Sequence, residues 1–309
     1  MLSFTKGQPI AEIVYKGKKK TKYINLLDET SDIPDIVPAH LDEMLPKSFY
    51  SGLRNISSTN MILLKKAIKT QNKNLLSSGN NALHQAYSTA NELLSELCKK
   101  NFYLPPSEGQ IECVPLQESS RISVFGPSGV GKSTWTGNFL QQYKKKYKKN
   151  KIYVFSPVHG DGAFSKVSVE YIKLDDTLLD DPLEINEFSN SVCVFDDIES
   201  INDKKIKEAI EKFRDICLEC GRHENITTLC ISHIILNGPS TKRMLNESDQ
   251  VVVFARSNFN AIKNLCVRYY GFSKDDINYL KQIGEKSRWQ CIKRSFPTCI
   301  ISSNNIRVI

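Results

Sequence analysis

The sequence predicts an α/β fold, with a three-layer domain around a mostly parallel central sheet and a smaller, mainly helical N-terminal region before it. Beyond about residue 105, short apolar segments alternate with segments of helical pattern. These apolar segments lack a regular polar alternation, which is typical of strands covered on both faces. Two proline-free segments with apolar residues three and four apart come earlier. We place the division between residues 104 and 105, giving an N-terminal region 1–104 and a larger domain 105–309.

The first hundred residues divide into three predicted parts. Residues 1–27 resemble a β-hairpin with a basic tip, and the acidic, proline-punctuated segment 28–46 predicts an extended connector. Two helices are expected over 53–78 and 80–100. The segment FYLPPSEGQ then suggests a boundary before the larger domain.

The larger domain contains a regular succession of predicted elements. Helices are expected to begin at residue 131 and to span 203–219. Strands are expected at 121–125, 151–155, 191–195, 226–231 and 250–254, with a closing pair over 288–293 and 298–302.

Composition limits the environment of the protein. The chain has 309 residues, of which 40% are hydrophobic, enough to bury a core without disulfides. Its nine cysteines are irregularly spaced and several lie in apolar runs, which favours reduced thiols in a cytosol-like compartment. We find no apolar signal segment and no run near the roughly 18 apolar residues of a membrane span. We therefore expect a protein that is not secreted and has no membrane partner.

The formal net charge of +8 is concentrated in two lysine runs, at residues 16–22 and 144–151. A lysine run is most often a solvated face. The alternative is a surface that contacts the phosphates of a nucleic acid. Neither run by itself identifies a partner.

The segment GPSGVGKST, residues 126–134, follows a predicted strand and opens a predicted helix. This is the full phosphate-loop pattern in the required context, where backbone N–H groups and the helix N-terminus surround an anion. We expect Lys132 to hold the terminal phosphates and Ser133 to bind Mg²⁺. The predicted nucleotide-binding residues are Gly126, Pro127, Ser128, Gly129, Val130, Gly131, Lys132, Ser133 and Thr134.

Two aspartates end the apolar strand SVCVF. Asp196 is expected to hold Mg²⁺, and Asp197 to align and deprotonate an attacking water, with Glu199 as an alternative base. Asp197 could instead only cap the following turn. We find no guanine-specific Asn-Lys-x-Asp motif, so the predicted cofactors are ATP and Mg²⁺.

The strand 226–231 ends in Ser232 and His233 rather than in further apolar residues. If this strand lies between the phosphate-loop strand and the acidic strand, its end faces the γ-phosphate. His233 would then contact the phosphate or the lytic water. The alternative is a histidine satisfied in the core or exposed in a loop.

Two arginines are candidates to complete a neighbouring subunit's site. Arg222 precedes the strand 226–231 and is badly placed for its own nucleotide, and Arg243 is the second candidate. A guanidinium supplied from a neighbour stabilises the charge of phosphoryl transfer and implies a ring. An ordinary surface or ion-pair role is the alternative for each.

With these motifs together, residues 105–309 resemble the FtsK/HerA superfamily of DNA-pumping ATPases, and most closely the packaging ATPases of poxvirus-type viruses and virophages. The segments that carry the resemblance are GPSGVGKST, VFDDIE, GRHENITTLCISH, TKRMLNESDQVVVF and SRWQCIKRSFP. It implies a RecA-like (ASCE) P-loop NTPase fold, Walker A roles for Lys132 and Ser133, and Walker B roles for Asp196 and Asp197. His233 corresponds to the polar sensor and Arg222 to the trans finger. The chain departs from many relatives in having Asp197 where they have Glu and His233 where Gln is common.

The resemblance implies an ATP-hydrolysing, ring-forming translocase that packages viral double-stranded DNA into a preformed capsid. It implies a pentamer or hexamer, capsid vertex proteins as partners, and a location in the host cytoplasm, the viral factory or the virion. Two alternatives are open: a plasmid or mobile-element DNA translocase or helicase, and a nucleotide-dependent assembly switch with little turnover.

Three other features are weaker. Cys217, Cys220 and His223 have a C-x2-C-x2-H spacing, but a structural zinc site would normally need a second pair of ligands. Loops at 160–164 and 202–207 could line a channel and touch DNA. Plain surface loops are the alternative for both.

Overall fold

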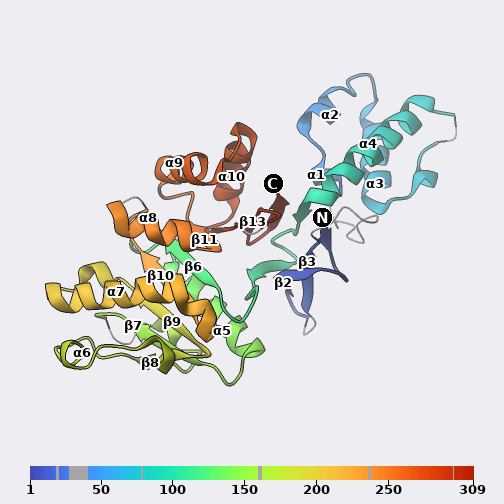
Figure 1. The fold of residues 1–309 in the computed structure, drawn as a ribbon. Coiled ribbons are helices and arrows are strands. Elements are labelled where there is room, and N and C mark those ends of the chain that lie inside the picture. Colours follow the sequence, from blue (N-terminus) through green and yellow to red (C-terminus); the bar gives the residue numbers. More distant parts are fainter. Residues whose placement is uncertain (19–20, 28–40, 78, 159–161, 236–237, 295) are drawn as a thin grey trace.

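The computed structural model describes residues 1–18, 21–27, 41–77, 79–158, 162–235, 238–294 and 296–309. It has two sheets and a separate group of N-terminal helices, which stand apart from the large sheet in Figure 1. None of the helices in these residues has the length and apolarity needed to span a bilayer.

The predicted basic hairpin is confirmed. β2 (Gln8–Tyr15) pairs antiparallel with β3 (Thr21–Leu26), and β1 (Leu2–Ser3) pairs with β3. A later strand, β5 (Gly109–Cys113), pairs with the other edge of β2 and completes a four-stranded sheet in the order β1-β3-β2-β5.

The N-terminal helices have a hydrophobic core of their own. They are α1 (Leu41–Met44), α2 (Lys47–Ser51), α3 (Ser58–Thr70) and α4 (Asn81–Lys100). The first predicted helix is shorter than 53–78, because Gln71 adopts a left-handed conformation with φ of 51° and ends α3. The connector predicted as extended over 28–46 lies mostly outside the described residues, and its described part is wrong at Leu41–Met44, which is helical.

The large sheet has ten strands in the order β4-β14-β13-β12-β11-β6-β10-β9-β7-β8. Six neighbours, from β11 to β8, run parallel, and the other four are antiparallel additions at one side. The parallel strands are β6 (Arg121–Phe125), β7 (Lys151–Phe155), β8 (Glu170–Tyr171), β9 (Ser191–Asp196), β10 (Thr227–Ser232) and β11 (Gln250–Val253). The antiparallel strands are β4 (Asn101–Tyr103), β12 (Gln290–Lys293), β13 (Cys299–Ser302) and β14 (Asn305–Val308).

Both faces of this sheet are buried, which confirms the predicted three-layer α/β class. In β9, Val192 and Val194 belong to one core and Cys193 and Phe195 to the other. One core contains residues of α5 (Lys132–Lys146) and the small sheet, and the other contains residues of α7 (Lys204–Cys220), α8 (Gly238–Glu247), α9 (Phe259–Tyr270) and α10 (Lys274–Lys286). A single-turn helix, α6 (Thr177–Asp180), lies beside α7.

Strand pairing crosses the predicted boundary between residues 104 and 105 in both directions. β4, before the boundary, pairs with β14 of the large sheet, while β5, after it, pairs with the N-terminal hairpin. The hairpin also shares its core with α5. The division into 1–104 and 105–309 stays a prediction, and the helical group 41–100 is the part with a separate core.

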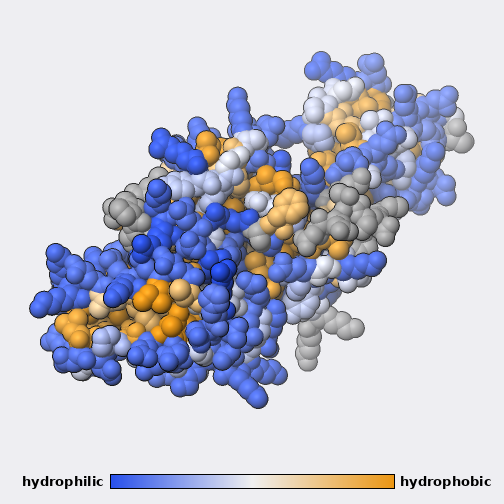
Figure 2. Space-filling view, in the orientation of Figure 1, coloured by the Kyte–Doolittle hydropathy of each residue, from blue (hydrophilic) through white to orange (hydrophobic). Residues whose placement is uncertain are grey.

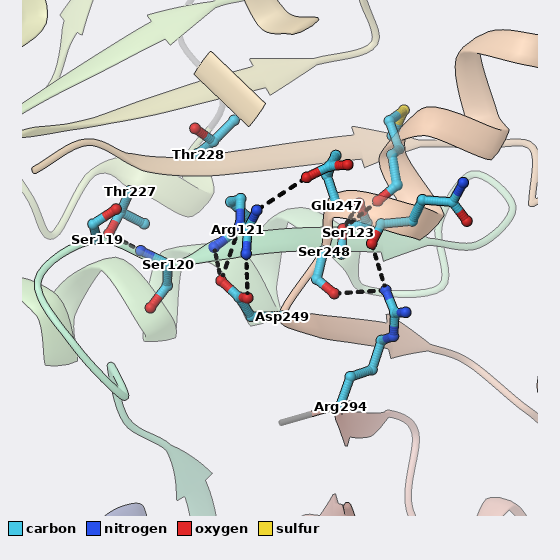
Figure 3. A network of polar contacts seen from close by, with 12 residues as sticks. Ser119, Ser120, Arg121, Ser123, Thr227, Thr228, Glu247, Ser248, Asp249 and Arg294 are labelled. Atoms are coloured by element: carbon cyan, nitrogen blue, oxygen red, sulfur yellow. Dashed lines mark hydrogen bonds and ion pairs between the residues drawn. The ribbon is translucent and has the colours of Figure 1, made fainter. Parts of the chain in front are cut away.

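A polar network ties the amino-terminal ends of β6 and β11 together (Figure 3). The Asp249 carboxylate accepts hydrogen bonds from the backbone N, Nε and Nη2 of Arg121 at 2.9, 3.3 and 2.7 Å, and Arg121 Nη1 donates to Glu247 at 3.0 Å. Arg294 Nη1 donates to the carbonyls of Asn246 at 3.1 Å and Ser248 at 2.8 Å, at the end of α8. These contacts fix the strand order from the end opposite the phosphate loop.

Candidate nucleotide site

The register of three parallel strands brings the predicted site residues to one edge of the sheet. β10 lies between β6 and β9, with Ser232 opposite Phe125 and Ile231 opposite Asp196. The residues that follow each strand, Gly126, Asp197 and His233, therefore meet at the carboxyl edge. In open parallel sheets this edge is where ligands bind.

The phosphate loop depends on two glycines in conformations that side chains rarely adopt. Gly129 has φ of 75° and Gly131 has φ of 109°. Gly131 is the N-cap of α5, and its carbonyl accepts the first helical bond from Trp135 N at 2.9 Å. The N–H groups at the start of α5 have no partner within the helix, so they are available to an anion.

Gly126 is constrained by space instead. A Cβ atom there would lie 2.9 Å from Val130 Cγ2 and 3.0 Å from Phe254 Cδ2. Gly126 N also donates to the carbonyl of Ser232 at 3.2 Å, which ties the loop to the end of β10. Phe254, a residue that the sequence analysis assigned only to a strand, thus supports the loop from the end of β11.

Lys132 lies at the centre of the candidate site. Its Nζ donates to the carbonyl of Pro127 at 3.3 Å and lies 3.0 Å from Nδ1 of His233. Burial lowers the pKa of Lys132 below its ordinary value of 10.5, and the nearby carboxylates of Asp197, Asp196 and Glu199 oppose that shift. The sequence predicted that Lys132 and His233 share a site, but not that they touch.

His233 also contacts the second aspartate. Its Nε2 lies 2.7 Å from Asp197 Oδ1, an ion pair whenever the imidazole is protonated. Asp197 has φ of 50°, a left-handed conformation that aspartate tolerates, and its carbonyl accepts from the backbone N of Ser200 at 2.9 Å. In the described structure its side chain makes no capping hydrogen bond. One imidazole thus connects Lys132 to Asp197.

The residues predicted to hold Mg²⁺ fit that ion chemically. Asp196 is the buried last residue of β9, and Ser133 lies in the first turn of α5. Glu199 Oε2 is buried and has no hydrogen-bond partner among the described residues. A hydroxyl and carboxylate oxygens are ligands that Mg²⁺ prefers, completed by water and phosphate oxygens. Thr134, the next residue of α5, is exposed.

Ser232 differs from the expectation that it faces the nucleotide. Its side chain is buried, its hydroxyl donates to the carbonyl of Ile234 at 3.3 Å, and it accepts from Ile234 N at 3.2 Å. The hydroxyl closes the turn after β10, which is a local reason for serine at a strand end.

The two candidate arginines lie away from this site. Arg222 is exposed in a 3₁₀ turn, Gly221–Glu224, before β10. The six residues of β10 separate it from His233 by roughly 20 Å. Arg243 makes ion pairs with two residues of α7, Asp215 and, at 3.3 Å from Nε, Glu219. Arg243 is therefore engaged within its own chain.

The weaker sequence features have different outcomes. Cys217 is buried in the core, where the hydrogen bond with the Cys193 thiol and burial raise its pKa, whereas Cys220 is exposed. The described residues contain no group of three His, Cys, Asp or Glu side chains placed to hold a metal.

The prediction of a loop over 202–207 is wrong from Lys204, where α7 begins after the Asp203 cap. Of the loop at 160–164, the described part Gly162–Phe164 is a 3₁₀ turn.

Two solved structures are similar to parts of this one at low sequence identity. The genome packaging NTPase B204 of Sulfolobus turreted icosahedral virus 2 covers 62% of this chain and 96% of its own, with a TM-score of 0.41 and 13% identity. The pCW3 conjugation coupling protein TcpA covers 65% of this chain and 64% of its own, with a TM-score of 0.40 and 14% identity. The predicted RecA-like order is confirmed in this chain itself, where β10 separates β6 from β9.

No family model matches the sequence. A sequence relative is the uncharacterized protein V3 of Sputnik virophage, which is 33% identical over 191 residues, 61% of this chain and 76% of that protein. This agrees with the virophage resemblance drawn from the motifs. The chain belongs to the family of the virophage protein V3.

Proposed function

We propose that the protein is an ATP-hydrolysing DNA translocase that packages double-stranded viral DNA into a preformed capsid. The observation that carries the proposal is the connected set Lys132, His233 and Asp197 at the edge where the phosphate loop begins. A site that only bound a nucleotide would not need a carboxylate and a polar strand end beside the γ-phosphate. The motif resemblance to packaging ATPases selects DNA as the substrate.

In the proposed reaction, the triphosphate lies along the phosphate loop and takes the place of His233 beside Lys132. Asp197 orients a water molecule and accepts its proton, and Glu199 is the alternative base. His233, released from Lys132, contacts the water or the phosphate. Ser133 and Asp196 would hold Mg²⁺, which neutralises charge on the β- and γ-phosphates.

Arg222 is proposed to complete the site of the neighbouring subunit. It is exposed and separated from its own phosphate loop by the length of β10, whereas Arg243 already pairs with α7. Such a shared site requires a closed ring, which we propose to be a pentamer or hexamer that docks at a capsid vertex. The proposed location is the host cytoplasm or viral factory, and fractionation of virus particles tests whether the protein is also carried in the virion.

The test is ATP hydrolysis by the purified protein, measured with and without duplex DNA. We expect duplex DNA to stimulate turnover, and Lys132→Ala to abolish turnover under both conditions. Hydrolysis that ignores DNA would contradict the translocase and support the assembly switch. No hydrolysis by the wild-type protein, with or without duplex DNA, would also reject the translocase.

A further inference from the structure

The two lysine runs lie far apart in the sequence, but one belongs to the small sheet and the other to the end of α5, which packs on that sheet. We propose that Lys16 and Lys18 of the hairpin, with Lys145, Lys148 and Lys149 at the end of α5, form one binding surface for a duplex phosphate backbone. We call these five residues the basic surface. The inference deepens the proposed function, because it places the duplex on a part of the chain outside the nucleotide site.

The end of α5 packs on the small sheet through two polar contacts. Lys145 Nζ lies 3.6 Å from Glu12 Oε2 on β2, and Gln142 Nε2 donates to Glu112 Oε2 on β5 at 2.7 Å. Lys146 Nζ donates to the carbonyl of Pro115 at 3.3 Å. These contacts join the second lysine run to the sheet that carries the first.

Lys16 directly follows β2, the strand that carries Glu12 of this contact. Glu12 and Val14 project from one face of β2, and the pairing continues to Lys16, whose N donates to the carbonyl of Glu108 at 2.8 Å. Lys16 is four positions after Glu12, so at most about 13 Å of extended chain separates them. In Figure 1, the end of α5 and the β2–β3 hairpin extend toward the lower side of the molecule.

The charge that faces solvent here is positive. The Lys145 side chain is 62% exposed, whereas its partner Glu12 is 4% exposed. Lys16, Lys18, Lys148 and Lys149 are all exposed, and the surface near the end of α5 is hydrophilic in Figure 2. The other carboxylates on these elements are Glu108, Glu112 and Glu118, each half-buried, and Glu170, which pairs with Lys151 at 3.5 Å.

A duplex backbone suits this surface better than other anions. Two groups of lysines on separate elements match an extended line of phosphates, and duplex DNA carries one charge per about 1.7 Å of axis. Single strands and membranes need aromatic or apolar contacts in addition. On β2, β3 and α5 the described residues include one strongly exposed aromatic side chain, Tyr23.

The basic surface is well separated from the nucleotide. α5 begins at Lys132 and ends at Lys146, so its 15 residues span about 22 Å. Substitutions at its far end therefore leave the phosphate loop intact, and duplex binding can be tested apart from hydrolysis.

The experiment measures the affinity of the full chain for a labelled duplex, without nucleotide, over a series of salt concentrations. Two variants reverse the charges at each end, Lys16→Glu/Lys18→Glu and Lys148→Glu/Lys149→Glu. We expect each to weaken binding and to lower the slope of log affinity against log salt by up to about 1.8, since each phosphate contact contributes about 0.9. The combined variant should lose up to about 3.6 of the slope.

The matched control is Lys66→Glu/Lys73→Glu, which makes the same charge change on exposed lysines of the N-terminal helices. Glutamine variants at the same positions, together with thermal unfolding, identify any variant that fails to fold. The proposal is wrong if the variant at either end of the basic surface binds duplex as the control does. It is also wrong if the variants lose their binding to anionic lipid vesicles but keep their binding to duplex. The proposed function can fail while the basic surface is supported. This is the outcome if the wild-type protein hydrolyses no ATP and Lys132→Ala binds duplex with an unchanged salt slope.

Discussion

At the scale of single residues, the site is organised by His233. Its two ring nitrogens lie beside Lys132 and Asp197, so one side chain contacts both the lysine proposed to bind phosphate and the proposed base. The ammonium of Lys132 is directed to His233 and to the carbonyl of Pro127. In the proposed reaction, a triphosphate replaces the contact with His233.

The lowered pKa of Lys132 predicts a pH dependence of ATP binding. Burial is the main cause of the shift below 10.5, and the charged form is the one that binds phosphate. The affinity for ATP should therefore fall as pH rises through the lowered pKa, at a lower pH than for an unperturbed lysine. Calorimetric titration at a series of pH values from neutral up to 10.5, the ordinary pKa of lysine, measures this. Lys132→Arg is the control, since arginine keeps its charge over that range, and an equal fall in both proteins would contradict the assignment to Lys132.

At the scale of elements, β6 and β11 are joined at their amino-terminal ends by a polar network. Arg121 opens β6 and Asp249 precedes β11, and three hydrogen bonds from Arg121 reach one carboxylate (Figure 3). Their side chains are 23% and 22% exposed, so the pair is only partly screened by water.

Asp249→Ala should therefore destabilise the fold. The change removes the acceptor of the Nε, Nη2 and backbone N–H of Arg121, while Nη1 keeps Glu247, at a cost of about 1–3 kcal/mol in the free energy of unfolding. Equilibrium denaturant unfolding measures the loss. Lys173→Ala is the comparison, because its partner Asp175 forms an exposed pair in which the lysine is 81% solvent-accessible. That substitution should leave stability nearly unchanged, and equal losses would show that the Arg121 network adds nothing.

Most elements of the larger domain could be predicted from the sequence. The strands 121–125, 151–155 and 191–195 were placed within a residue of their ends, because apolar β-branched runs bounded by turn residues are strong local signals. The helices α8, α9 and α10 and the short strands β4, β5 and β14 were not predicted. A three-residue strand such as Asn101–Tyr103 exists only through its pairing with β14, and its own sequence carries no periodic pattern.

At the scale of the whole molecule, the structure accounts for nine free cysteines. Eight are buried and Cys220 is exposed. Burial raises the pKa of Cys230 and of Cys299 to about 12 and that of Cys98 to about 11, so little thiolate forms at neutral pH.

Titration with a thiol reagent should therefore label one cysteine in the native protein and all nine after denaturation. Cys220→Ser should abolish labelling of the folded protein. The eight buried cysteines should still react after denaturation. Rapid native labelling of two or more cysteines would show that the cores open readily.

The proposed ring makes a second prediction at this scale. Arg222→Ala should leave ATP affinity unchanged and lower turnover by a factor of about 10³ or more, as expected for a finger supplied by a neighbour. Mixing this variant with Lys132→Ala protein should restore part of the turnover, because each supplies what the other lacks. Arg243→Ala is the comparison and should keep most of its turnover, while failure of the mixture to recover activity would remove Arg222 from the neighbour's site.

The sequence by itself determined the phosphate loop, the acidic strand end and the α/β class, because each depends on a short run of neighbouring residues with its own conformational preference. Only the tertiary structure decided that His233 touches both Lys132 and Asp197, that Arg243 is paired with α7, and that the two lysine runs share one unit of the fold. These relations join residues far apart in the chain. They follow from the order and register of strands, which arise from packing of the whole domain and leave no local trace in the sequence.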